Sequence, residues 1–321
     1  MNPRQLKVIV TALVVLLVLW GASAYFHRSS DSLGGYVVPK LTPPTVDSVT
    51  LHAPGDTVIL AKQESGAWTV NGYRAALDGV KDFLGQLSDT AGAQLVAESP
   101  ASQARLGVDS ASATSIRVEA GGKTLLTLLV GHMGSGYSSA YVRRPGAKQI
   151  YMVPQPLHSL VTRKVDAWRN KTIVQVPKDS ASAVTVQIGR HSYTMTKAKT
   201  AWRFTNGAEA DTTAVARLLG DLSDVTAFGF ATSTEQKAAH FSRPDRSVTI
   251  SGPKGGTLAR LAFDSTADGF LVQSQGDSVI YKIALTLGRA LTPADSTMIA
   301  PKAAAKPAAN ATPAPSGGKK K

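Results

Sequence analysis

The chain has 321 residues, of which 43% are hydrophobic and 18% charged, a composition typical of a globular protein. Its formal net charge is +13, but three of the 35 basic residues lie within residues 1–28 and five within 299–321, where no acidic residue occurs, so 27 remain against 22 acidic residues in between. That middle part has no basic stripe interleaved with aromatic residues, which argues against nucleic-acid binding. The absence of cysteine excludes disulfides, thiolate catalysis, Cys-ligated zinc and a lipidated N-terminal cysteine.

Residues 1–28 predict a signal anchor, that is, an N-terminal transmembrane helix. A short basic stretch precedes Val8–Phe26, whose only polar members are Thr11 and Ser23. In helical form this stretch is long enough to cross a hydrocarbon core of about 30 Å. A cleavable signal peptide, cut after Ala24, is the alternative, but its apolar region is usually shorter. The basic residues keep the N-terminus cytoplasmic, so everything after the anchor is exported.

Residues 29–45 are rich in Ser, Gly and Pro without apolar periodicity, which predicts a tether between the membrane and the folded body. At the other end, residues 299–321 are rich in Ala, Pro and Lys and cannot build a core. We expect this tail to be disordered, with its lysines either solvated or in contact with an anionic lipid or polymer.

One motif recurs between these ends. Phe83-Leu84-Gly85-Gln86-Leu87-Ser88-Asp89 returns as Leu218-Leu219-Gly220-Asp221-Leu222-Ser223-Asp224, 135 residues later. Each copy closes an apolar stripe with helical spacing, which is Val80, Phe83, Leu84 and Leu87 in the first and Val215, Leu218, Leu219 and Leu222 in the second. The repetition predicts two units, residues 46–176 and 177–298.

Strands are expected around these helices, as β-branched runs bounded by turn residues. We predict them at 49–52, 57–62, 67–70, 94–97, 115–119, 123–130, 137–143 and 149–153, and again at 184–188, 192–197, 201–204, 228–231, 247–251, 257–263, 269–274 and 278–283. Short helices are expected to start at Ser99 and Ser233, the latter with Gln236 in a capping box. The predicted fold class is α+β, with two tandem repeats that each place an amphipathic helix on one face of an antiparallel sheet.

Catalytic and metal sites find no support in the sequence. The six histidines have no metal-ligand spacing, and the glycine-rich loop Gly131–Gly136 lacks the Lys-Ser/Thr ending of a phosphate loop. A triad can be drawn from Ser138, His158 and Asp166, but only by selection from abundant residue types. We therefore predict no catalytic residue, no metal and no cofactor.

Two features leave alternatives open. Trp68 and Trp202 take equivalent places in the two units, where each is either a buried core residue or a sugar-stacking platform. The first unit also contains one concentration of basic and aromatic residues, which is either a packed interdomain joint or an anion- or partner-binding surface. The candidate partner-binding residues are Arg143, Arg144, Arg163, Lys164, Trp168, Arg169 and Lys171.

The order of these motifs resembles the uncharacterised bacterial family called domain of unknown function 4340 (DUF4340), over about residues 46–298. The motifs that carry the resemblance are the strand hairpin, the tryptophan strand, the helix ending in Leu-Ser-Asp, Leu106-Gly107-Val108-Asp109 and Trp168-Arg169-Asn170-Lys171. The second unit departs from the pattern at His240-Phe241-Ser242 and has no second Trp-Arg-Asn-Lys. The resemblance implies a bacterial protein with one membrane segment, in the company of ABC transport systems of the gliding-motility type.

The sequence predicts a single-pass membrane protein whose bulk is extracytoplasmic, and the resemblance implies that the membrane is the bacterial cytoplasmic membrane. We expect a non-enzymatic binding or scaffolding protein in contact with protein partners, and the resemblance implies that it is accessory to an envelope or ABC-type transport complex. The alternatives are a cell-wall or polysaccharide-binding module that uses exposed aromatic residues and the lysine tail, and an uncharacterised hydrolase.

Overall fold

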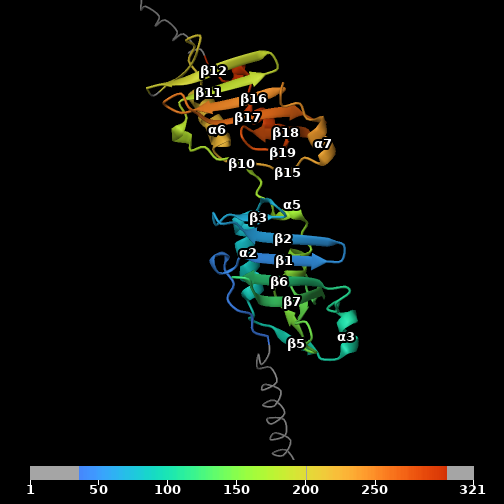
Figure 1. The fold of residues 1–321 in the computed structure, drawn as a ribbon. Helices are drawn as coiled ribbons and strands as arrows, with labels where there is room; N and C mark the ends of the chain where they lie inside the picture. Colours follow the sequence, from blue (N-terminus) through green and yellow to red (C-terminus); the bar gives the residue numbers. More distant parts are fainter. Residues whose placement is uncertain (1–35, 200, 302–321) are drawn as a thin grey trace, which may run out of the picture. The chain divides into compact units, whose positions relative to one another are not determined.

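A computed structural model describes residues 36–199 and 201–301 (Figure 1). The chain divides into two compact units, and the boundary falls between Asn170 and Lys171, six residues before the boundary expected from the sequence. The reason is β10 (Thr172–Val174), a short strand that pairs with β14 (Val225–Thr226) inside the second unit. The predicted anchor 1–28, the tether up to residue 35 and the tail from residue 302 lie outside the described residues. Within the described ranges, no helix combines the length and apolar character needed to span a membrane.

The first unit is built on a nine-stranded sheet in which every neighbouring pair is antiparallel. Its order is β4-β3-β2-β1-β6-β7-β8-β9-β5. The strands are β1 (Ser48–Ala53), β2 (Asp56–Lys62), β3 (Trp68–Val70), β4 (Tyr73–Arg74), β5 (Gln94–Ala97), β6 (Thr114–Ala120), β7 (Lys123–Met133), β8 (Ala140–Arg143) and β9 (Ile150–Val153).

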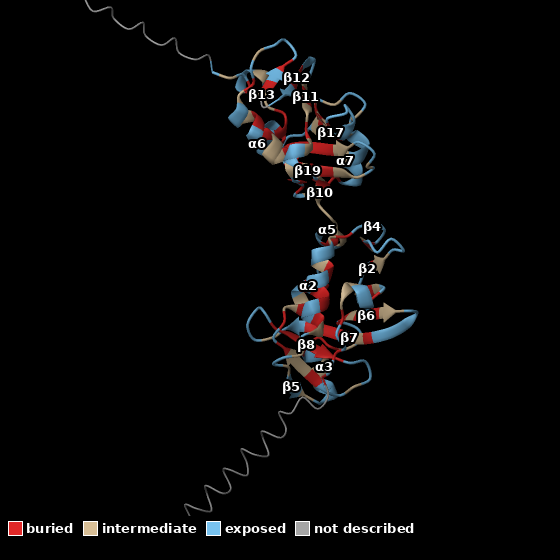
Figure 2. Ribbon diagram, turned by 90° about the vertical axis from the view of Figure 1, so that its left-hand side faces the viewer, coloured by how far each residue is buried: buried red, intermediate tan, exposed pale blue. Residues whose placement is uncertain are grey.

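Helix α2 (Leu77–Ser88) covers one face of this sheet. Its four predicted stripe residues are all buried, and they share a core with alternate side chains of β1, β2 and β6. Figure 2 shows the buried side of α2 turned toward the strands. The short helices α4 (Leu157–Val161) and α5 (Val165–Trp168) complete this layer, because Leu157, Leu160 and Trp168 belong to the same core.

The start of the described chain also packs on this core. Tyr36, Val38 and Leu41 are buried in it, followed by the 3-10 turn η1 (Pro43–Thr45), and the backbone amide of Leu41 donates to the Ser88 hydroxyl at 2.8 Å. Residues 36–45 are therefore part of the folded unit. This corrects the expectation that residues up to 45 are a tether, since hydrophobic residues in a Pro-rich stretch can pack without helical or strand periodicity.

The opposite face of the sheet is partly covered. After α3 (Pro100–Arg105), Leu106 and Val108 pack on Ile150 of β9. The remaining part of this face, over β1, β2 and β6, carries half-exposed or exposed residues such as Thr50, Ile59 and Arg117. The first unit thus has one face that packs in the main core and one face that is open over β1, β2 and β6.

The second unit contains an eight-stranded antiparallel sheet in the order β13-β12-β11-β16-β17-β18-β19-β15. Its strands are β11 (Ala183–Ile188), β12 (His191–Ala198), β13 (Ala201–Phe204), β15 (Gly229–Phe230), β16 (Arg246–Ser251), β17 (Thr257–Ser265), β18 (Gly269–Ser274) and β19 (Ile280–Ala284). The short turns η2 (Lys178–Ser180) and η3 (Asp295–Thr297) flank it in sequence.

Helix α6 (Thr212–Ser223) packs on the core face of this sheet, together with α8 (Leu285–Leu291). Val215, Leu218 and Leu222 are buried, whereas Leu219 of the predicted stripe is half-buried. Asp211 caps α6 by accepting the amides of Thr213 at 2.8 Å and Ala214 at 3.0 Å.

The structure corrects the predicted capping box of α7 and decides between the two roles considered for Trp68 and Trp202. Helix α7 (Ser233–Ala238) does begin with a capping box, but Thr232 and Glu235 form it, one residue before the predicted pair. Both pairs fit the Ser/Thr-x-x-Glu/Gln pattern, so spacing alone does not separate them. Trp68 and Trp202 are both buried in the cores, which rules out their use as sugar-stacking platforms.

Candidate functional site

The structure does not gather the seven predicted partner-binding residues into one surface. Arg143 and Arg144 lie at the end of β8, whereas the residues from Arg163 to Arg169 lie in and around α5. Arg169 forms a bridge with Ala75, directly after edge strand β4. Six strand spacings separate β4 from β8 in the sheet order, which is roughly 29 Å. Lys171 belongs to the second unit, where its carbonyl oxygen accepts the amide of Ala227.

Arg143 is a structural residue. Its side chain is buried, with Nε donating to the Val108 carbonyl at 2.9 Å and Nη1 donating to the Ala147 carbonyl at 3.0 Å. A buried guanidinium needs such partners to offset its lost hydration. Arg143 thereby fixes the turn after α3 and the β8–β9 turn, and it is not available to a partner.

Arg144 is exposed, and its guanidinium donates to the carbonyl oxygen of Val37. This bond fastens the beginning of the described chain to the β8–β9 turn. Burial raises the pKa of the neighbouring Tyr36 hydroxyl well above its usual range, against an opposing effect of the Arg144 charge. Tyr36 is therefore a neutral packing residue.

Trp168 is also buried, with 1% of its surface exposed. Its ring meets the Phe83 ring edge-on at 5.4 Å between centroids, and the Arg163 guanidinium lies 5.6 Å from the Trp168 ring centroid. The indole Nε1 is buried without a hydrogen-bond partner among the described residues. Neither a glycan nor a protein partner can reach a ring enclosed in this way, so Trp168 is not available as the partner-binding residue that the sequence suggested.

The remaining cations near α5 have acidic or aromatic partners. Lys164 lies 2.9 Å from Asp56, and this hydrogen bond and charge hold the pKa of the Asp56 carboxyl below its usual value. Arg169 pairs with Asp166 at 3.0 Å and lies 4.0 Å from the ring centroid of Tyr73. This cluster joins α5 to the sheet edge, in the way that long cationic side chains commonly cover apolar surface.

The residues considered for catalysis have separate structural partners. His158 Nδ1 lies 2.7 Å from the Gly131 carbonyl oxygen, and Asp166 is bonded to Arg169. The loop that begins at Gly134 joins β7 to β8, as a hairpin connection. Over the described part of the chain, no three His, Asp or Glu side chains gather as a metal site would require.

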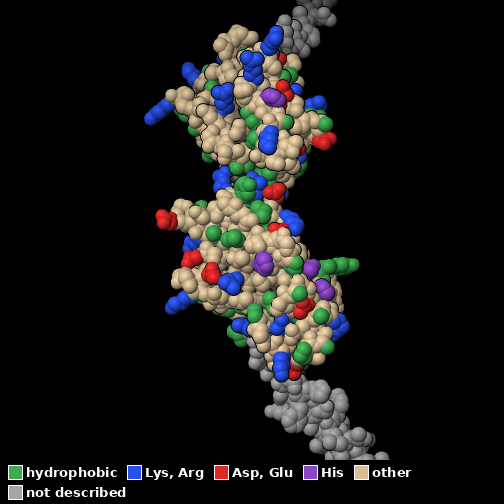
Figure 3. Space-filling model, turned by 45° about the vertical axis from the view of Figure 1, so that its right-hand side comes forward, with side chains coloured by type: hydrophobic (Ala, Val, Ile, Leu, Met, Phe, Trp, Pro, Cys, Tyr) green, Lys and Arg blue, Asp and Glu red, His purple; other side chains and the backbone are tan. Residues whose placement is uncertain are grey.

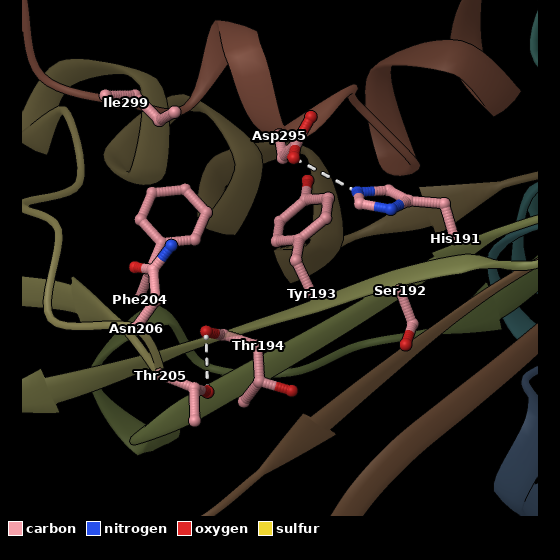
Figure 4. Close-up of a pocket in the computed structure, with 9 residues that line it drawn as sticks. All are labelled: His191, Ser192, Tyr193, Thr194, Phe204, Thr205, Asn206, Asp295 and Ile299. Carbon is pink, nitrogen blue, oxygen red and sulfur yellow. Dashed lines mark hydrogen bonds and ion pairs between the residues drawn. The ribbon is translucent and has the colours of Figure 1, made fainter.

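The second unit contains a pocket that the sequence did not indicate (Figure 4). It has a volume of about 290 Å³. Residues of β12, of the turn after β13 and of η3 line it. Its lining consists of His191, Ser192, Tyr193, Thr194, Phe204, Thr205, Asn206, Asp295 and Ile299. The ladder between β12 and β13 begins at Met195, and the Thr205 amide also donates to the Thr194 carbonyl, so the pocket lies where β13 no longer runs beside the start of β12.

One wall of the pocket is aromatic and ionisable. Tyr193 and Phe204 lie 5.7 Å apart between ring centroids, and the Tyr193 hydroxyl donates to the Pro293 carbonyl at 2.7 Å. Burial, and secondarily the Asp295 charge, raises the pKa of Tyr193 above its usual range. His191 Nε2 lies 3.0 Å from the Asp295 carboxylate. This pair links β12 to η3 across 104 residues of sequence, a contact that no local pattern signals.

The opposite side of the pocket is polar. Ser192 projects away from His191 and Tyr193 in Figure 4, because neighbouring residues of a strand point to opposite faces. His191 therefore does not activate the Ser192 hydroxyl. The lining thus combines aromatic rings on one side of β12 with hydroxyl groups on the other, and a cavity with both kinds of group can bind a small polar molecule.

On the face drawn in Figure 3, Lys and Arg side chains are scattered among uncharged and acidic ones.

The fold and these sites define a class of protein: an α+β chain of two antiparallel-sheet units, with a small polar-aromatic pocket in the second. Residues 68–244 match the family described as Domain of unknown function (DUF4340). The chain belongs to this family. No curated protein and no solved structure matches this chain.

Proposed function

We propose that this protein is a membrane-anchored, extracytoplasmic binding or scaffolding protein without catalytic activity, accessory to an envelope or ABC-type transport complex. The sequence Val8–Phe26 supplies the anchor of this proposal. The structural roles of Arg143, His158 and Asp166 support a non-enzymatic reading, because each of these residues is bonded to its own unit.

We further propose that the exported part contains two copies of one unit. Helices α2 and α6 start and end 135 residues apart, as do the two Leu-Ser-Asp motifs. In each sheet a hairpin, β1–β2 or β11–β12, pairs through its first strand with the hairpin β6–β7 or β16–β17. An equivalent connection in both halves supports duplication of one ancestral unit.

The open sheet faces carry the binding proposal. In the first unit a cross-strand row of outward residues runs Ile59, Thr50, Arg117, Thr127. In the second unit the matching row runs Thr194, Thr185, Thr249, Arg260. These side chains are exposed or half-exposed. A sheet face of short hydroxyl side chains with one arginine offers a flat, hydrogen-bonding surface suited to a protein partner.

Mild crosslinking followed by purification of the full chain tests this function. We expect envelope proteins to be recovered with the wild type and lost with Arg117→Glu or Thr249→Arg, which place a reversed or new charge on an open face. Arg217→Glu, on the exposed side of α6, is the matched control and keeps the partners. Recovery of a lone monomer that turns over a substrate contradicts the proposal.

The pocket supports a second candidate, the binding of a polysaccharide. A glycan pull-down with the full chain is expected to survive deletion of residues 302–321 and to fail with Asn206→Ala combined with Ser192→Ala. Binding that depends on the lysine tail alone, and is indifferent to the two pocket substitutions, contradicts this candidate.

A further inference from the structure

The chain enters the first unit at a fixed place. The ring of Tyr36 lies 5.3 Å from that of Tyr151 on β9, and Arg144 holds the next carbonyl, that of Val37. Tyr36 is 2% exposed. The cross-strand partner of Tyr151 is Leu95 of β5, so the chain enters beside the last strand of the sheet. Figure 1 shows the blue start of the described chain next to β5.

Strand β5 is an unprotected edge. Within the described residues, no strand pairs with its outer side. Natural proteins usually protect such edges with charged residues or proline, but Gln94–Ala97 contains neither. Leu95 is 47% exposed and Val96 is 41% exposed, and Val37 at the chain entry is 68% exposed. An exposed apolar edge of this kind commonly marks a surface that contacts another molecule or a membrane.

The length of chain before Tyr36 limits the distance between this edge and the proposed membrane anchor. Nine residues separate Phe26 from Tyr36, and this connection spans at most about 35 Å when fully extended. We propose that the edge formed by Val37, Leu95 and Val96 rests on the membrane surface, with these side chains in the headgroup region. The inference rests on the proposed anchor, and it adds a second, reversible contact with the lipid to that function.

The charges around the edge favour an anionic surface. Lys40, Arg144 and Lys148 are exposed close to the chain entry and in the β8–β9 turn. The carboxylate of Glu98, which follows β5, accepts from the Gln149 amide at 3.1 Å. Basic side chains held beside an apolar edge attract anionic lipid headgroups.

The absence of cysteine makes the test direct. Full chains with the single substitution Val96→Cys or Ile59→Cys are labelled with an environment-sensitive fluorophore and reconstituted into vesicles of phosphatidylcholine, with or without phosphatidylglycerol. Ile59 is the matched control, because its side chain is 45% exposed but lies on β2, six strands from β5. Emission is recorded before and after adding lipid that carries a headgroup-level quencher.

We expect a blue shift and quenching of the Val96 label, both stronger with phosphatidylglycerol, and a water-like spectrum for the Ile59 label. Addition of Lys40→Glu and Lys148→Glu should reduce the quenching. Protein that floats with the vesicles while both labels stay water-like overturns the edge contact and leaves the anchor standing. Protein that does not float with the vesicles contradicts the anchor itself, and the edge proposal falls with it.

Discussion

The backbone amide of His132 donates to the carbonyl oxygen of Leu106 at 3.0 Å, which brings the turn after α3 directly onto strand β7. This close approach requires a glycine at position 131. A Cβ atom there would collide with the Leu106 carbonyl and with Gly107 and Val108. The loop and the strand are both backbone at this contact, so neither can yield by rotating a side chain.

Gly131→Ala is therefore expected to lower the free energy of unfolding of the first unit by about 1–3 kcal/mol, as overpacking does. Gly85→Ala is the control. Gly85 lies inside α2 with open space around it, so alanine there should raise stability by about 0.5–1 kcal/mol. Urea unfolding followed by far-UV circular dichroism measures both. Equal effects of the two substitutions contradict the close contact.

Trp168 serves the core, and its replacement should reduce stability. We expect Trp168→Ala to cost about 3–5 kcal/mol, as for other large buried aromatic residues. Trp168→Phe should cost clearly less, because it keeps the edge-on contact with Phe83 and removes the unpartnered indole N–H. Urea denaturation of the three proteins separates the cases. Unchanged stability of Trp168→Ala would mean that the side chain is not enclosed.

The two main helices begin differently, which predicts substitutions of opposite sign. Asp211 caps α6, so Asp211→Ala should destabilise the second unit by about 1 kcal/mol. The N-cap of α2 is Ala76, which has an extended backbone and no side-chain cap. Ala76→Asp should stabilise the first unit by up to about 1 kcal/mol. Thermal denaturation is the measurement, and a loss of stability with Ala76→Asp would contradict the assignment of that cap.

The ion pair between Glu235 and Lys282 predicts a pH dependence. The Lys282 ammonium group, 2.6 Å away, and the Thr232 cap lower the pKa of Glu235 from 4.5 to about 2. Because the folded-state pKa is depressed, the contribution to stability is complete above the unfolded value and is lost as pH falls toward 2.

The Tm difference between the wild type and Glu235→Gln should accordingly be constant above pH 4.5 and shrink as the pH approaches 2. Glutamine keeps the hydrogen bonds of the capping box, so the substitution isolates the charge. Glu209→Gln is the control, since its pair with Arg203 is open to solvent and should contribute little at any pH. A difference that grows toward acid pH contradicts the predicted sign.

The sequence predicts the regular elements well where periodicity is strong. The α2 stripe is buried at all four positions, and the strands at 94–97, 201–204 and 269–274 have the predicted bounds. Such patterns work because burial on one face forces the spacing of apolar residues. Boundaries set by distant pairing are different. The unit boundary follows from β10 and β14, two short strands about 50 residues apart that carry no periodic signal.

Sites were harder to predict than elements. Arg143 belongs to a basic-aromatic concentration in the sequence, but its burial depends on carbonyl groups supplied by Val108 and Ala147 from separate turns. The pocket depends on His191 and Asp295 meeting across the fold. A sequence shows which residues are charged. It does not show which groups will pair with them, because tertiary structure brings those partners together.

The packing of Tyr36, Val38 and Leu41 also has a mechanical meaning. Any pull from the N-terminal side reaches first the Arg144 bond to Val37 and the three buried side chains, before it reaches a strand of the sheet. The segment between Tyr36 and Ser48 runs from β9 toward β1, so this load would peel it progressively across the core. Under such a load the entry segment detaches before any strand of the sheet is pulled.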